Sequence, residues 1–218
     1  MKHFQYHLPT DIERESMATI ARELGQMGAV IPEENEAVVK RVIHTTADFE
    51  YAKNLVFTPQ AVSHALSAMK DRPVIITDTN MALAGINKPA LEQVGGKVHC
   101  FMADADVAEM ARENGTTRAT AAIDKAVALY PKAIFACGNA PTALIRLAQL
   151  MEEKGVRPSL IIGVPVGFVN VVESKEEILA LAEEKGVSAI VARGRKGGSN
   201  VAAAICNALL YEAVGRRL

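Results

Sequence analysis

The chain has 218 residues, half of them hydrophobic, with 24 basic and 25 acidic side chains. This length fits one large domain or two small ones, and the hydrophobic content is enough for a substantial core. Balanced charge, the absence of tryptophan and the scattered placement of the other aromatic residues argue against a nucleic-acid partner.

Compartment and metal binding are also constrained by the sequence. No apolar run approaches the roughly 20 residues of a membrane span, and the amino terminus has no apolar signal core, so we expect a cytoplasmic protein without membrane association. Cys100, Cys137 and Cys206 are widely spaced within or beside apolar stretches, which is typical of small core residues in a reducing compartment. The sequence contains no CxxC, HExxH or calcium-loop pattern, so it predicts no metal site.

The first 70 residues are predicted to be helical. Apolar residues recur at helical spacing in three segments, at about Thr10–Met27, Pro32–Thr46 and Pro59–Lys70. Pro32 stands at a first-turn position with acidic residues behind it, as is common where helices begin. We expect these helices to form an amino-terminal extension (residues 1–70) that buries its apolar faces on the rest of the chain or on a second subunit.

From residue 73 onwards, short apolar runs alternate with helical segments. The runs predict strands at Val74–Thr77, Lys97–Met102, Ala133–Cys137, Leu160–Gly163 and Ser188–Ala192. Helices are predicted at about Asp104–Asn114, Thr117–Tyr130, Ala140–Lys154, Ser174–Lys185 and Ser199–Ala213. The alternation predicts a single α/β domain over residues 1–218, in which residues 73–218 form a mainly parallel sheet flanked by helices.

His44 closes the second predicted helix, within the stretch RVIHTTADFEY. It lies beside the apolar stripe and one turn after Lys40 and Arg41, so the three side chains would present nitrogen donors on one face. Such a face suits a polyanionic ligand, and His44 is a candidate for acid–base chemistry. A solvated basic face with a capping histidine is the alternative interpretation.

The loop after the last predicted strand carries the most specific binding signal. Gly197 and Gly198 would let the backbone approach a ligand, Ser199 could cap the following helix, and Lys196 adds charge at a helix start that favours anions. The lysine precedes the glycine pair, so the segment is not a P-loop. An ordinary strand–turn–helix connection is the alternative.

Polar residues also follow two earlier strands and open one helix. Asp78 and Thr79 follow the first predicted strand, while Asn139 and Thr142 follow the third. Ligands of open parallel sheets bind beyond the carboxyl ends of the strands, so these are candidate binding residues, with helix capping as the alternative. Arg118 lies in the first turn of a helix, where the dipole disfavours a cation, which suggests an anionic partner or a surface ion pair.

Five segments resemble signatures of the precorrin-8X methylmutase family, most closely its anaerobic-pathway branch, which acts on cobalt-precorrin-8. Between Arg41 and Tyr211 they are, in the family's order, RVIHTTADFEYA, TDTNMALAGINK, CGNAPTAL, GVPVGFVNVVESKE and GRKGGSNVAAAICNALLY. The resemblance implies an isomerase of cobalamin biosynthesis that moves a methyl group from C-11 to C-12 of the macrocycle, converting cobalt-precorrin-8 into cobyrinic acid. It also implies a parallel α/β fold and a homodimer with substrate sites near the subunit interface.

The resemblance also implies roles for particular residues. The histidine matching His44 is the family's catalytic residue, thought to protonate the macrocycle and so favour a 1,5-sigmatropic shift. A substrate with many carboxylates around an apolar plane needs hydrogen-bond donors spread around the site and an apolar surface beneath the plane. Met81 could extend this apolar surface, but we expect it to be a core residue. The expected substrate-binding residues are Ser16, Arg41, Thr45, Asp78, Thr79, Arg118, Asn139, Thr142, Gly167, Phe168, Lys196, Gly197, Gly198 and Ser199.

A methyl shift needs no electron carrier, external nucleophile or hydrolytic water, so we expect no cofactor, and any cobalt arrives within the substrate. Lys40 and Arg41 should disfavour protonation of His44 in the empty protein, and an anionic substrate should raise its pKa. Four alternatives remain open: the metal-free reaction from precorrin-8X to hydrogenobyrinic acid, a non-catalytic tetrapyrrole carrier, a phosphate-ligand enzyme and a structural dimerisation protein.

Overall fold

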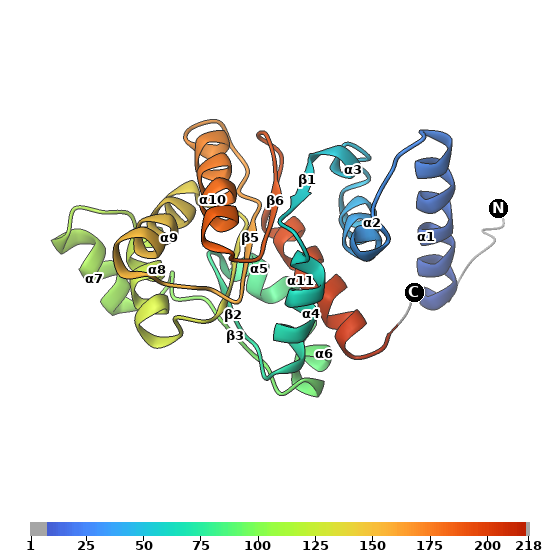
Figure 1. Cartoon of the computed structure of the whole chain (residues 1–218). Coiled ribbons are helices and arrows are strands. Elements are labelled where there is room, and N and C mark those ends of the chain that lie inside the picture. Colours follow the sequence, from blue (N-terminus) through green and yellow to red (C-terminus); the bar gives the residue numbers. More distant parts are fainter. Residues whose placement is uncertain (1–7, 217–218) are drawn as a thin grey trace, which may run out of the picture.

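The architecture is a six-stranded sheet covered by helices on both faces (Figure 1). The computed structural model describes residues 8–216, so the first seven residues of the predicted extension and the last two of the chain lie outside the described residues. The strands run in the order β1-β6-β5-β4-β2-β3, and all pairings are parallel except that of β1 with β6. Their bounds are β1 Leu55–Phe57, β2 Val74–Thr77, β3 Lys97–His99, β4 Ile134–Cys137, β5 Leu160–Gly163 and β6 Ala189–Ala192.

The central strands are apolar on both sides because helices cover both. Every residue of β4, β5 and β6 is buried, as is typical of parallel strands. Successive residues alternate between two cores: Ile162 packs with the helices of one face, and Ile161 with those of the other. The predicted mainly parallel α/β fold is therefore confirmed.

The helices divide between the two faces of the sheet. One face is covered by α2 (Glu36–Thr46), α4 (Ala61–Lys70), α5 (Asn80–Gly85), α6 (Lys88–Gln93) and α11 (Ser199–Ala213). The other is covered by α8 (Arg118–Leu129), α9 (Pro141–Lys154) and α10 (Val171–Lys185), with α7 (Ala105–Glu113) packed on α8 (Figure 1).

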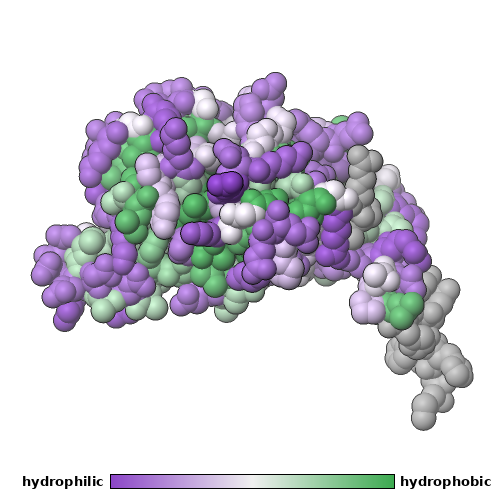
Figure 2. All heavy atoms as spheres, turned by 90° about the horizontal axis from the view of Figure 1, so that it is seen from below, coloured by the Kyte–Doolittle hydropathy of each residue, from purple (hydrophilic) through white to green (hydrophobic). Residues whose placement is uncertain are grey.

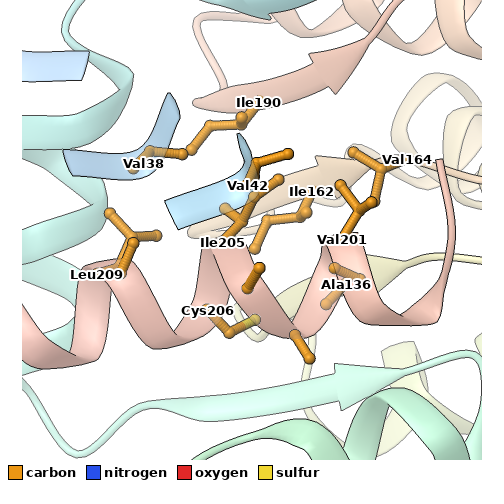
Figure 3. Packing of buried hydrophobic residues seen from close by; sticks show 14 of the residues in the cluster. Val38, Val42, Ala136, Ile162, Val164, Ile190, Val201, Ile205, Cys206 and Leu209 are labelled. Atoms are coloured by element: carbon orange, nitrogen blue, oxygen red, sulfur yellow. The ribbon is translucent and has the colours of Figure 1, made fainter. Parts of the chain in front are cut away.

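Helix α11 lies between the sheet and α2. Figure 3 shows its side chains, including Val201, Ile205 and Leu209, among residues of α2 and of strands β4, β5 and β6. Nine of its fifteen residues are buried, four of them alanines, so it packs closely on several neighbours at once. This explains why the segment is apolar around most of its circumference.

Helix α1 (Pro9–Gln26) is the outermost helix and is separated from the sheet by α2 (Figure 1). Only Ile20 and Leu24 of this helix are buried. Glu13 adds ion pairs to Arg41 of α2, at 2.8 Å, and to Arg216, at 2.9 Å. The amino-terminal helix is thus docked on the chain's own helices by a small apolar contact and these ion pairs.

Several short elements of the structure were not predicted from the sequence. Strand β1 lies within the predicted helical extension, so that extension is not purely helical and contributes an edge strand. Three residues are too few for a strand pattern to emerge, and the six-residue helix α6 and the short α3 (Tyr51–Asn54) were missed for the same reason. Helix α5 is the short helix implied by the capping alternative for Asp78 and Thr79. The second predicted helix begins with a 3₁₀ turn, η1 (Glu33–Asn35), and the strand predicted over 97–102 ends at His99.

On the face viewed in Figure 2, apolar areas alternate with hydrophilic ones. Within residues 8–216, no helix combines the length and apolar character needed to cross a bilayer.

Substituting Ile205→Ala should reveal how much α11 contributes to stability. Ile205 is fully buried, so its truncation leaves a cavity and should lower the free energy of unfolding by about 3 kcal/mol. Urea unfolding followed by circular dichroism measures this change. Leu129→Ala, at a side chain that is 54% exposed, is the matched control and should change stability by less than about 0.5 kcal/mol. Equal effects of the two substitutions would contradict this account of the core.

Candidate functional site

His44 lies in the last turn of α2 and faces a cavity of about 420 Å³ between α1 and α2. Ser16 and Thr19 of α1 and Phe49 after α2 are among the other lining residues. The structure thus brings Ser16 and His44, 28 positions apart in the sequence, to one cavity. Thr45 is exposed and is not among the residues that line it.

The end of α2 is defined by local geometry immediately after His44. Ala47 adopts a left-handed conformation (φ 54°) and its N–H donates to Ile43 O at 2.7 Å, which closes the helix. The Thr46 hydroxyl donates to Val42 O and accepts the N–H of Asp48. This turn directs Phe49 to the wall of the cavity.

The pKa of His44 is lowered from its ordinary value. Partial burial disfavours the charged ring, the Arg41 guanidinium adds repulsion, and Glu13 acts in the opposite direction. The net lowering means that the imidazole of the empty protein is mainly neutral at pH 7.

The predicted face of three nitrogen donors at Lys40, Arg41 and His44 is not formed. Arg41 is buried, ion-paired with Glu13 and placed 5.1 Å from the centre of the Tyr211 ring. Lys40 is bonded to Glu36, one turn earlier on the helix. Lys40 and Arg41 line a second hollow, of about 790 Å³, bordered by α1, α2 and α11, because the docking of α1 separates them from the His44 cavity.

Asp78 organises the point where the strand order reverses, between β2 and β4. Its side chain is 3% exposed, and its carboxylate accepts the N–H groups of Gly138, Asn139 and Ala140 at 2.7–2.8 Å. Burial raises the pKa of Asp78, while these hydrogen bonds act against the rise. Asp78 therefore holds the loop after β4 and is not exposed to a ligand.

The predicted caps of two helices are wrong and one is confirmed. Helix α9 is preceded by Ala140, not capped by Asn139, because the Asp78 carboxylate receives the local N–H groups. Ser199 is the first residue of α11 and does not cap it; its hydroxyl lies 2.7 Å from the Thr79 hydroxyl. Thr79 caps α5 by accepting the N–H of Ala82 at 3.0 Å.

The glycines of the β6–α11 loop serve contacts between loops. A Cβ atom on Gly197 would lie 2.1 Å from Val164 O, so only glycine fits there. Gly198, at φ 142°, donates its N–H to Val164 O at 2.9 Å. The sequence predicted close approach of a ligand to these glycines, and the structure shows that Gly197 and Gly198 closely approach the β5–α10 loop.

Lys175 of α10 was not singled out from the sequence. It is fully buried, and its Nζ donates to Gly194 O and Lys196 O, both at 2.8 Å. Burial lowers the pKa of Lys175 to about 8. The sequence did hold a signal, because Lys175 falls at helical spacing between the buried Val171 and Ile178, where a lysine needs a specific partner.

Lys196 links the strand-end loops to the neighbourhood of His44. Its Nζ donates to Asp48 Oδ2 at 2.5 Å and lies 2.8 Å from Glu50, and these carboxylates raise its pKa. Phe49, between the two acidic residues, lines the His44 cavity. The β6–α11 loop and the His44 cavity are therefore neighbouring parts of one region.

Exposed apolar side chains follow β2 and β5. Phe168 is 84% exposed, with the Arg195 guanidinium 5.5 Å from its ring centre, and Val169 is also exposed. Gly167 precedes them at φ 146° and donates its N–H to Arg195 O at 3.3 Å. Met81 is 72% exposed, so its expected core placement is wrong: α5 turns it to solvent.

Arg118 and Thr142 lie near each other, at the beginnings of α8 and α9. Thr117, the cap of α8, donates its hydroxyl to that of Thr142 at 3.0 Å. Arg118 lines a hollow of about 330 Å³ together with Arg112. This hollow shares no residue with the His44 cavity, so the described chain contains two separate groups of candidate residues.

A metal would require a group of suitable ligands. Across residues 8–216 no three His, Cys, Asp or Glu side chains gather in the way that a metal site needs.

Comparison with known proteins shows extended similarity. The family model described as precorrin-8X methylmutase matches residues 11–212. The cobalt-precorrin-8 methylmutase of Salmonella typhimurium is 48% identical over 178 residues, 81% of each chain, and that of Leptospira interrogans is 41% identical over 208 residues, 94% of each chain. A crystal structure of precorrin-8X methylmutase from Thermus thermophilus is 37% identical, with a TM-score of 0.83 over 94% of this chain and 98% of that one.

Substituting Asp78→Asn should destabilise the protein. The amide keeps one acceptor oxygen but turns an NH₂ group toward buried N–H donors, so we expect a loss of about 2 kcal/mol of unfolding free energy. Urea unfolding measures the loss. Asp71→Asn, at an exposed residue just before β2, is the control and should stay within about 0.5 kcal/mol of wild type. An Asp78→Asn protein as stable as this control would contradict the role assigned to Asp78.

Proposed function

The chain belongs to the precorrin-8X methylmutase family of cobalamin-biosynthesis isomerases, and we propose that it converts cobalt-precorrin-8 into cobyrinic acid. In this proposal a methyl group moves from C-11 to C-12 of the macrocycle. The cobalt belongs to the substrate, and the reaction needs no resident cofactor. The cobalt form is supported by the names of the Salmonella and Leptospira relatives.

The observation that carries the proposal is the position of His44 in its cavity. A histidine that lines a cavity together with Ser16 and Phe49 can reach a bound macrocycle, whereas one buried among core residues could not. We propose that protonated His44 donates its proton to the macrocycle and thereby favours migration of the methyl group. The macrocycle then returns a proton to His44, because the substrate and the product of an isomerisation have the same composition. The remaining contribution is to hold the ring in a reactive shape.

The lowered pKa of His44 requires that substrate binding supplies the proton-donating form. Burial and Arg41 disfavour the imidazolium in the empty protein. A polycarboxylate placed beside the ring would favour it and raise the pKa. His44 would thus become a good acid only after the substrate has docked.

Substrate carboxylates and the apolar plane need different surfaces. We propose that Lys196, Ser199 and the backbone near Gly197 take part in holding carboxylates, and that Phe168 lies against the macrocycle. In the empty protein Lys196 is ion-paired with Asp48 and Glu50, so a substrate carboxylate would have to share the ammonium group with these two side chains.

We further propose a cytoplasmic homodimer with the substrate near the subunit interface. The hollow at Arg118 and the cavity at His44 share no residue within one chain, so a second subunit is a physical means of bringing both to one macrocycle. Exposed Phe168 and Val169 are suitable for burial in such an interface.

Replacing His44 by alanine should abolish catalysis without abolishing binding. We expect turnover of cobalt-precorrin-8 to fall at least about 100-fold, because a positioned proton donor is lost, while product binding stays close to wild type. Visible spectroscopy follows both. His64→Ala removes another histidine from an exposed helix position outside the cavity and should retain turnover. Near-normal turnover of His44→Ala would refute the catalytic role, and a wild-type protein that binds corrinoid without turnover would be a carrier.

The pKa of His44 should rise when product binds. In the empty protein it lies below its ordinary value near 6.5, and the carboxylates of the product should move it upward. Nuclear magnetic resonance titration of the His44 ring, with and without cobyrinic acid, measures the shift. Glu13→Gln removes the charge that raises this pKa and should lower it further in the empty protein. A pKa that is unchanged or lower with product bound would eliminate the proposed timing of protonation.

A further inference from the structure

We propose that Lys175 is a positioning residue for corrinoid binding, which holds the N–H groups of Arg195 and Gly197 outward as donors to a substrate carboxylate. This inference rests on the proposed function, because it assigns a carboxylate-bearing corrinoid to the β6–α11 loop. Lys175 itself lies beneath the loop and would not touch the substrate.

The geometry starts from two hydrogen bonds made by one buried ammonium group. Lys175 Nζ donates to Gly194 O and to Lys196 O, at 2.8 Å each, from a side chain with no exposed surface. Between these two carbonyls, Arg195 O accepts the N–H of Gly167 at 3.3 Å. Three successive carbonyl groups of the loop are therefore engaged by α10 or by the loop that precedes it.

The orientation of the N–H groups follows from the planarity of the peptide bond. In a trans peptide the N–H points opposite to the carbonyl of the preceding residue. With Gly194 O and Lys196 O directed at Lys175, the N–H groups of Arg195 and Gly197 point away from it. Neither N–H has a hydrogen-bond acceptor among residues 8–216. Outward N–H groups on one short loop form the kind of concavity that binds anions.

The energetics suggest that Lys175 does not serve packing alone. It occupies the buried stripe of α10 between Val171 and Ile178, where an apolar side chain would pack without the cost of burying a charge. Within residues 8–216 no carboxylate lies within ion-pair distance of its Nζ. The hydrogen-bond partners of Lys175 are backbone carbonyls of the β6–α11 loop, so Lys175 fixes the conformation of that loop.

Lys175→Met is the direct test, and Lys185→Met on the same helix is the matched control, because Lys185 pairs with Glu184 and makes no bond to the loop. In the ligand-free protein, hydrogen exchange of the amides of residues 194–199 should be faster in Lys175→Met than in the control. The affinity for cobyrinic acid, measured from the visible spectrum, should fall about tenfold or more. KM for cobalt-precorrin-8 should rise by a larger factor than kcat falls, because His44 is untouched.

Each outcome decides the proposal. Unchanged exchange, or faster exchange with wild-type affinity and KM, would overturn it while leaving the proposed function intact. A wild-type protein that fails to bind cobyrinic acid would overturn the proposed function and this inference with it. If Lys175→Met does not fold, Lys175→Gln takes its place. The shorter glutamine side chain can donate to at most one of the two carbonyls, whereas methionine donates to neither. The loss of affinity should therefore be smaller for Lys175→Gln than for Lys175→Met, and wild-type affinity of Lys175→Gln would overturn the proposal.

Discussion

The arrangement of this protein depends on the burial of one apolar helix, α11, between the sheet and the outer helices. Its alanines allow close approach: a Cβ atom on Gly85 of α5 would lie 2.8 Å from that of Ala203. The helix begins at Ser199, beside the strand-end loops, and packs along α2, whose last turn carries His44. The distance between the candidate proton donor and the candidate carboxylate-binding loop is thus set by how α11 fills the space between two layers. Close packing of buried side chains resists displacement of α11 relative to α2.

The loops at the carboxyl ends of the strands are organised by two buried charges of opposite sign. Asp78 accepts three backbone N–H groups after β4, and Lys175 donates to two backbone carbonyls after β6. Backbone groups in these loops have no ladder partner, so side chains must satisfy them. The contact of Gly197 with Val164 O then locks the β6–α11 loop to the β5–α10 loop. Such a framework is suited to a ligand whose carboxylates must be met at fixed positions, because little conformational freedom remains to be lost on binding.

The environment of His44 differs from the one that its helix suggested. Glu13 on α1 neutralises Arg41, and Glu36 is bonded to Lys40, so the cations of α2 are engaged within the protein. What remains around the histidine is a cavity lined by apolar side chains, by the hydroxyls of Ser16 and Thr19 and by the carboxylates of Glu15 and Glu23. The protonation state of the ring still depends on charges placed beside it, because nearby opposite charge favours the imidazolium. The proposed activation of His44 by its own anionic substrate is consistent with the family's isomerase chemistry.

The sequence by itself determined the fold class, the boundaries of the longer elements and the family. Burial on one face of a helix imposes a repeat of 3.6 residues, and burial of a strand on both faces imposes a short continuous apolar run; both patterns can be read locally. It also placed His44 at the end of a helix and gave a helix cap as the alternative role of Thr79, since both follow from neighbouring residues. Only the tertiary structure decided that Arg41 is buried against α1, that Gly197 faces Val164, that β1 joins β6 and that Lys175 holds the last loop. Each of these depends on a contact between segments distant in the chain, and no local periodicity specifies which distant group a side chain or a backbone carbonyl will meet.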